Sequence, residues 1–122
     1  MNDINQAVVS GNLAREPEIR ITPSGIQVAD LVVATHYKVR SNGRERTTFL
    51  RCTFWNKEAE EVKVANPQKG DLIEVTGRLA DDNYIPEGQT ISTKGRIKLD
   101  SCLNFRLISK NKNKSDTEAT KE

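Results

Sequence analysis

The fold is decided by residues 47–67, which read TTFLRCTFWNKEAEEVKVANP. The first part, Thr47–Trp55, alternates polar with β-branched and aromatic side chains, which predicts a strand. The second part, Asn56–Ala65, contains helix formers, starts with an asparagine that can cap a helix, and places glutamates early, where the helix dipole favours acids. Pro67 disfavours helix in the residue before it. The stretch therefore predicts a strand that leads directly into one short helix.

Further strand patterns lie on both sides of this stretch. They cover Ile4–Leu13, Glu18–Ile21, Ile26–Val39, Leu72–Leu79 and Thr90–Ile108, the last broken near Gly95 and Asp100. Turn residues separate them at Thr22-Pro23-Ser24-Gly25, Ser41-Asn42-Gly43 and Pro86-Glu87-Gly88. About five strands, with one short helix between the third and fourth, is the plan of the oligonucleotide-binding (OB) fold. We therefore predict an all-β, five-stranded Greek-key barrel.

The chain divides into a folded part and a polar end. Its 122 residues suit one domain with a single core. From residue 109 the sequence reads SKNKNKSDTEATKE, which contains too little apolar surface to offset the entropy of ordering. We expect an OB domain over residues 1–108 and a disordered polar tail over residues 109–122.

Several function classes find no support. No apolar run approaches the roughly 20 residues that span a bilayer, and the N-terminus lacks the pattern of a secretory signal, so we expect a cytoplasmic protein without membrane contact. Cys52 and Cys102 lie in alternating apolar segments and are expected as buried free thiols, with a redox or disulfide role as the alternative. His36 is the only histidine, too few soft ligands for zinc. We expect neither a metal nor another cofactor.

Catalysis finds no support either. The scattered glycines form no phosphate-binding loop, and no serine or cysteine stands in a nucleophile-elbow context. The acidic pair Asp81-Asp82 has too few oxygen ligands nearby for a metal. We expect a binding protein rather than an enzyme.

The strongest binding feature is a cluster of cations and aromatics. The net charge is only +2, so the position of the charges matters more than their sum. Residues 36–51 carry five basic side chains opposed only by Glu45; with the neighbouring rings, the cluster comprises Tyr37, Lys38, Arg40, Arg44, Arg46, Phe49, Arg51, Phe54 and Trp55. Single-stranded nucleic acid offers phosphates to cations and base faces to rings. The alternative is a solvated hairpin with its aromatics in the core.

An ordered set of motifs resembles the bacterial single-stranded DNA-binding proteins. Residues 11–25, GNLAREPEIRITPSG, resemble the family's GxL, PE and turn pattern, and the match continues through Val28-Ala29 and Leu31–Thr35. It resumes at Phe49–Lys57 and Ala59–Val62, and ends with Lys69–Leu79, KGDLIEVTGRL. The resemblance covers roughly residues 4–108.

The resemblance implies a homo-oligomer, usually a tetramer, around which single-stranded DNA wraps during replication, recombination or repair. By position, the stacking residues would be Phe49, Trp55 and Tyr84. Arg51, Lys57 and Lys69 match basic positions, and Arg20 is a further candidate. The residues themselves add the hairpin cations Lys38, Arg40, Arg44 and Arg46, with Tyr37 near the position of a further family aromatic, where this chain has Val39.

Two departures from the family pattern modify these expectations. Asp81-Asp82-Asn83 stands where basic residues commonly precede the hairpin aromatic, so we expect weaker DNA binding than in a typical member. The C-terminus lacks the family's acidic recruiting tip, which indicates a specialised member or, alternatively, a truncated chain. Two rival functions stay open: a primosome-type OB module that mainly binds proteins, and an RNA-binding barrel.

Overall fold

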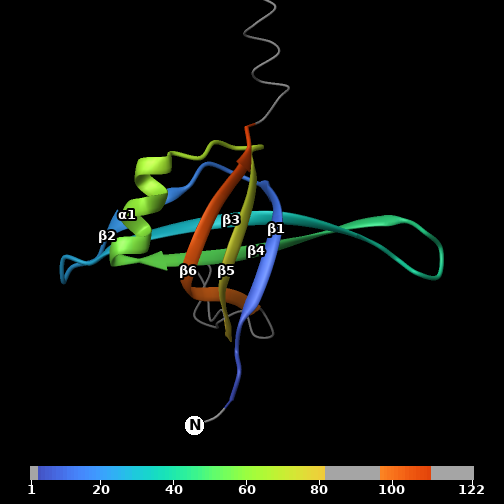
Figure 1. The fold of residues 1–122 in the computed structure, drawn as a ribbon, viewed down its shortest axis with the longest axis horizontal. Coiled ribbons are helices and arrows are strands. Elements are labelled where there is room, and N and C mark those ends of the chain that lie inside the picture. The colour runs from blue at the N-terminus through green and yellow to red at the C-terminus, as the bar shows by residue number, and fades with distance from the viewer. Residues whose placement is uncertain (1–2, 82–96, 111–122) are drawn as a thin grey trace, which may run out of the picture.

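The computed structural model describes residues 3–81 and 97–110 and confirms the predicted order of strands and helix (Figure 1). Its elements are β1 (Ala7–Leu13), β2 (Glu18–Ile21), β3 (Gln27–Lys38), β4 (Glu45–Trp55), α1 (Asn56–Ala65), β5 (Leu72–Asp81) and β6 (Ile97–Ser109). The predicted ranges agree to within a few residues. The exception is the start of the last strand, which lies outside the described residues, as do Tyr84 and the tail from residue 111.

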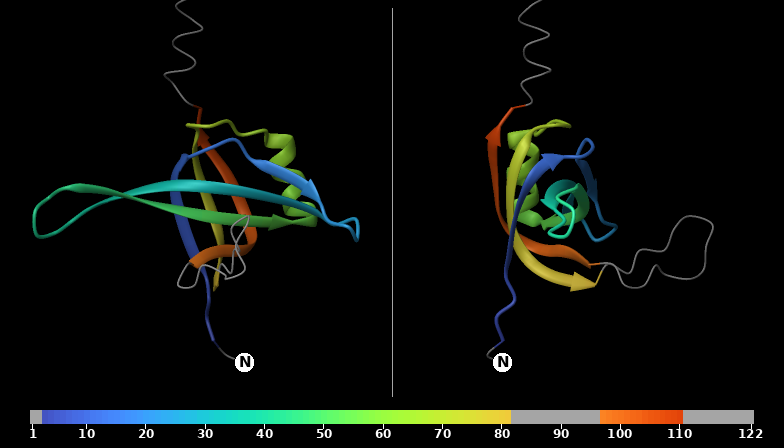
Figure 2. Two further views of the ribbon diagram at one scale, coloured as in Figure 1. Left: turned by 180° about the vertical axis from the view of Figure 1, so that it is seen from behind. Right: turned by 90° about the vertical axis from the view of Figure 1, so that its right-hand side faces the viewer.

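Five strands close into a barrel. They pair in the order β1-β5-β6-β4-β3, and β1 pairs again with β3 through Asn12↔Ala34 and Leu13↔Val33. All these pairings are antiparallel except the short parallel contact between β4 and β6. β2 pairs only with the first part of β3 and stays outside the ring. Figure 2 shows the strands curving around one interior, which confirms the predicted OB fold.

The closure of the barrel depends on Gly11. This residue of β1 is buried where β1 crosses β3, and a Cβ atom there would collide with the backbone carbonyl of Ala34. Only glycine allows two backbones to approach so closely. The glycine of the GxL motif is therefore required because a larger residue would keep β1 and β3 apart.

The core is formed by the inward-facing side chains of the strands and by one face of α1. Phe54 is fully buried and packs edge-on against Phe105, with ring centroids 6.1 Å apart and planes at 85°. The helix adds Ala59 and Val62 to the same cluster. Phe54 is therefore a core residue. For this ring, the alternative prediction of an aromatic in the core is correct.

The two cysteines are free and buried, as predicted. Both belong to the core cluster. A hydrogen bond with the Cys102 thiol, together with burial, raises the pKa of Cys52 well above its usual range. A thiol kept neutral in this way reacts poorly, so Cys52 serves as a small core residue.

The prediction that Asn56 caps the helix is wrong. Trp55 occupies the N-cap position and makes no side-chain hydrogen bond to the helix, while Asn56 follows with a left-handed φ of 54°. The strand runs into the helix without a loop, so the cap falls on a strand residue. The end of the helix is as predicted: Asn66 is left-handed, and its N–H donates to the carbonyl of Val62.

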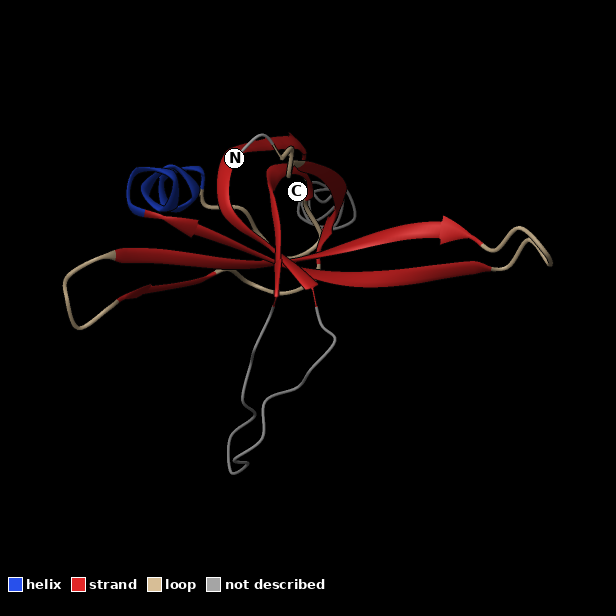
Figure 3. Ribbon diagram, turned by 90° about the horizontal axis from the view of Figure 1, so that it is seen from below, coloured by secondary structure: helices blue, strands red, loops and turns tan. Residues whose placement is uncertain are grey.

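A long hairpin projects from the barrel (Figures 1 and 3). It consists of the outer parts of β3 and β4 and the turn between them, residues 36–48, and we call it the arm. Almost all its side chains are exposed. At the tip, Gly43 has a φ of 69°, and its N–H donates to the carbonyl of Val39. The predicted Asn-Gly turn is thus confirmed and places the basic hairpin well clear of the core.

Candidate nucleic-acid interface

Alternation along β4 separates core residues from outward residues. Leu50, Cys52 and Phe54 turn inward, so their neighbours turn to the opposite side of the sheet. The register of β3 and β4 pairs each outward residue with one on β3. We call this surface the outer face; its residues are Val28, Asp30, Val32 and Ala34 of β3 and Phe49, Arg51, Thr53 and Trp55 of β4.

Two aromatic rings mark the two ends of the outer face. Phe49 is 65% exposed, and Trp55 is half-buried. Six residues of strand separate them by about 20 Å, so they can stack on different bases of one strand. Across the ladder they face the small buried residues Ala34 and Val28. The predicted pair of stacking rings is therefore brought to one surface, with an arginine between them.

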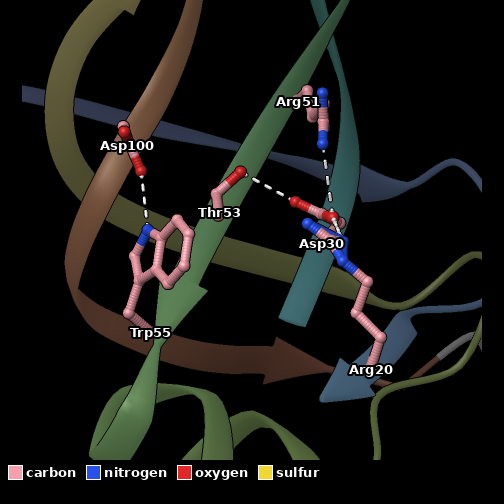
Figure 4. A network of polar contacts seen from close by, with 6 residues as sticks. All are labelled: Arg20, Asp30, Arg51, Thr53, Trp55 and Asp100. Atoms are coloured by element: carbon pink, nitrogen blue, oxygen red, sulfur yellow. Dashed lines mark hydrogen bonds and ion pairs between the residues drawn. The ribbon is translucent and has the colours of Figure 1, made fainter. Parts of the chain in front are cut away.

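A buried carboxylate holds that arginine (Figure 4). Asp30 is 2% exposed, and its Oδ2 accepts from Arg20 at 2.8 Å and from Arg51 at 3.3 Å. Its Oδ1 accepts from the hydroxyl of Thr53 at 2.7 Å. Two cations thus meet at one carboxylate. This cluster joins Arg20 and Arg51 into one unit.

Trp55 is fixed by a second carboxylate (Figure 4). Its indole Nε1–H donates to Oδ1 of Asp100 on β6 at 2.9 Å. β6 lies next to β4 through the pairing of Leu99 with Cys52. The outer face therefore extends across three strands of the barrel.

The arm carries exposed basic residues on both of its sides. Lys38, Arg40, Arg44 and Arg46 are all exposed, and no carboxylate of the described residues forms an ion pair with them. Lys38 pairs with Glu45 in the ladder, and Tyr37 pairs with Arg46. By strand alternation, Tyr37 and Arg46 point away from the side that carries Phe49 and Trp55. The arm is thus basic on both sides, and Tyr37 is not part of the outer face.

The two remaining predicted cations, Lys57 and Lys69, lie on the segment that connects β4 to β5. Lys57 is exposed in the first turn of α1, shortly after Trp55. Lys69 is exposed on the loop between α1 and β5, where its backbone N–H donates to Glu16 at 3.2 Å. Tyr84 lies outside the described residues.

Sequence reasoning missed the residues beneath the site: Asp30, Thr53 and Asp100. A signal for Asp30 was present, because a single acid interrupts the apolar run Val28–Val33 and a buried charge requires a partner. Asp100 has no comparable signal, since its partner lies on another strand far away in sequence.

No helix in residues 3–81 and 97–110 is long and apolar enough to cross a bilayer. In the same residues, no three side chains of the types His, Cys, Asp and Glu gather as a metal site.

A closed OB barrel with rings and cations on one outer face defines an OB-fold binding protein. The model of the single-strand binding protein family matches residues 4–100, and the chain belongs to this family. The resemblance seen in the sequence is confirmed.

Known proteins agree with this assignment. Three relatives carry the name single-stranded DNA-binding protein. They come from Thermus aquaticus (38% identity over 81 residues; 66% of this chain, 30% of the relative), Bacillus cereus (38% over 88; 70% and 49%) and Enterococcus faecalis (34% over 108; 86% and 54%). The chain thus spans about half, or less, of the length of these relatives.

A similar fold occurs in a solved structure described as Plasmodium falciparum SSB complex with ssDNA. The TM-score is 0.72 at 17% identity, and the match covers 89% of this chain and 98% of that one. At this identity the likeness supports the fold.

Proposed function

We propose that this chain binds single-stranded DNA without sequence preference and protects it during replication, recombination or repair. The observation that carries the proposal is the outer face, where Phe49 and Trp55 flank Arg51. Every base has a π-face, so stacking tolerates any sequence, and the arginine can pair with the phosphates between the stacked bases. We take residues 1–108 as the binding domain and place the protein with the nucleoid in the cytoplasm.

The Asp30 cluster suits a phosphate contact. Arg20 and Arg51 meet at one carboxylate, so their two guanidiniums lie close enough to bind one phosphate group together. Arg20 keeps 41% of its side chain exposed and Arg51 keeps 27%. A guanidinium has five N–H donors, so each can bind Asp30 and still reach a phosphate oxygen.

We further propose that the arm follows the DNA backbone electrostatically. Each phosphate contact contributes about 0.7 to the slope of log K against log salt for a single strand. The double variant Arg40→Ala/Arg44→Ala should therefore lower the slope by about 1.4 if each arginine binds one phosphate. Fluorescence anisotropy of a labelled oligo-dT, measured at several salt concentrations, gives this slope.

The matched control for the arm is Lys63→Ala, which removes an exposed cation from the last turn of α1. Its slope should equal that of the unchanged protein. Equal slopes for the arm variant and the unchanged protein would show that the arm does not contact the DNA.

We also propose that copies of the chain associate, with a tetramer as the expected state. Large apolar side chains are exposed on the strands of the barrel, among them Val8 at 63%, Leu79 at 49% and Leu103 at 64%. Burial against another copy would stabilise such a surface. Sedimentation velocity should find a species larger than the 13.7 kDa monomer; a monomer at micromolar concentration would contradict the proposal.

A further inference from the structure

Next to the Trp55 site, the ladder between β5 and β6 is irregular. Thr76 pairs with Asn104, but Arg78 pairs with Asp100, so β6 uses two more residues than β5 over this interval. Ser101, inside the irregular segment, has a left-handed φ of 46°. Such a bulge bends a strand and changes the direction of the side chains beside it. Here the bulge begins at Asp100, whose side chain reaches Trp55.

The bulge holds Asp100 firmly. Oδ1 of Asp100 accepts two hydrogen bonds, from Trp55 Nε1 at 2.9 Å and from the backbone N–H of Ser101 at 2.7 Å. Packing behind the bulge is tight, because a Cβ atom at Gly77 would lie 2.9 Å from the sulfur of Cys102. The backbone of the bulge therefore helps to hold the carboxylate that binds the indole.

The charge of Asp100 is also balanced. Partial burial acts to raise the pKa of Asp100, but hydrogen bonds from Trp55 and Ser101, with the nearby charges of Lys98 and Arg78, lower it below its usual range. Asp100 is thus ionised at neutral pH and acts as an acceptor. The two neighbouring cations reduce its repulsion of a DNA phosphate.

We propose that Asp100 is a positioning residue that fixes the indole of Trp55 on the outer face and so strengthens base stacking. The hydrogen bond restricts rotation of the side chain, so less conformational entropy is lost when a base stacks. It also occupies the only hydrogen-bond donor of the indole, which leaves the ring to contact bases through its π-system alone. This inference rests on the proposed binding of single-stranded DNA.

The test compares Asp100→Asn with Asp100→Ala. Both variants remove the charge, but asparagine keeps an acceptor oxygen for the indole. We expect Asp100→Ala to bind labelled oligo-dT about two- to tenfold more weakly than Asp100→Asn, as for the loss of one hydrogen bond. The same comparison in a Trp55→Phe background, which lacks the N–H, should give equal affinities. Thermal unfolding verifies that all four variants are folded at the assay temperature.

A second readout needs no DNA. Trp55 is the only tryptophan, so time-resolved fluorescence anisotropy reports its motion directly. Asp100→Ala should add nanosecond motion of the ring, whereas Asp100→Asn should not. Equal affinities and equal ring motion in the two variants would overturn the inference, as would an affinity ratio that persists with phenylalanine. If the unchanged protein fails to bind oligo-dT, the proposed function is wrong, while the ring motion still decides whether Asp100 positions Trp55.

Discussion

The double variant Phe49→Ala/Trp55→Ala is expected to bind oligo-dT between about 30-fold and about 20,000-fold more weakly than the unchanged protein. Each stacked base is worth about 1–3 kcal/mol on alanine replacement. The two rings lie about 20 Å apart along β4, so their effects should add to about 2–6 kcal/mol. Anisotropy of a labelled oligonucleotide measures the loss without relying on the tryptophan.

The control for this variant is Val64→Ala. Val64 is 75% exposed on α1 and does not belong to the outer face of β3 and β4, so its truncation should leave the affinity unchanged. The single variants Phe49→Ala and Trp55→Ala should stay folded, because both rings lie outside the core cluster. A loss below threefold for the double variant, or unfolding of either single variant, would show that the rings do not form the binding site.

Removal of the buried carboxylate should give the largest change in stability. We expect Asp30→Ala to lower the free energy of unfolding by about 2–4 kcal/mol. Thr53, which is 1% exposed, loses its acceptor, and two guanidiniums lose their common anion. Both arginines remain partly exposed and can turn toward water, which keeps the loss below that of a fully buried pair. Urea unfolding followed by circular dichroism measures the change.

Two variants sharpen this second test. Asp30→Asn keeps an acceptor for Thr53 and should destabilise the protein less than Asp30→Ala. Glu60→Ala removes an exposed acid from α1 and should change the stability by no more than about 0.5 kcal/mol. If Asp30→Ala proves as stable as Glu60→Ala, the cluster does not hold the outer face together.

Local sequence patterns predicted the order of strands and helix because each of these elements has a signal in its own residues. The alternation in Thr47–Trp55 and the proline after Asn66 fix where β4 and α1 end. Asn42-Gly43 likewise fixes the turn of the arm. The prediction that Asn56 caps the helix was wrong because β4 enters α1 without a loop. Trp55 therefore takes the N-cap position that an asparagine often fills.

The candidate site could be predicted only in part. Alternation along β4 brings Phe49, Arg51 and Trp55 to one side, and sequence order alone suffices for that. The two carboxylates beneath them depend on register and on strand order, since Asp30 meets Thr53 across a ladder and Asp100 reaches Trp55 from β6. These contacts join residues far apart in sequence, which no local pattern encodes.

Fluorescence of Trp55 tests the central claim most directly, because the chain has no other tryptophan and this one lies on the outer face. The protein is titrated at low salt with poly-dT, poly-U and duplex DNA. We expect strong quenching by poly-dT and less by poly-U, since uracil lacks the apolar methyl group of thymine. Duplex DNA should quench little, because its bases are already stacked on each other. Absence of quenching by poly-dT, or equal quenching by the duplex, would contradict single-strand binding at this face.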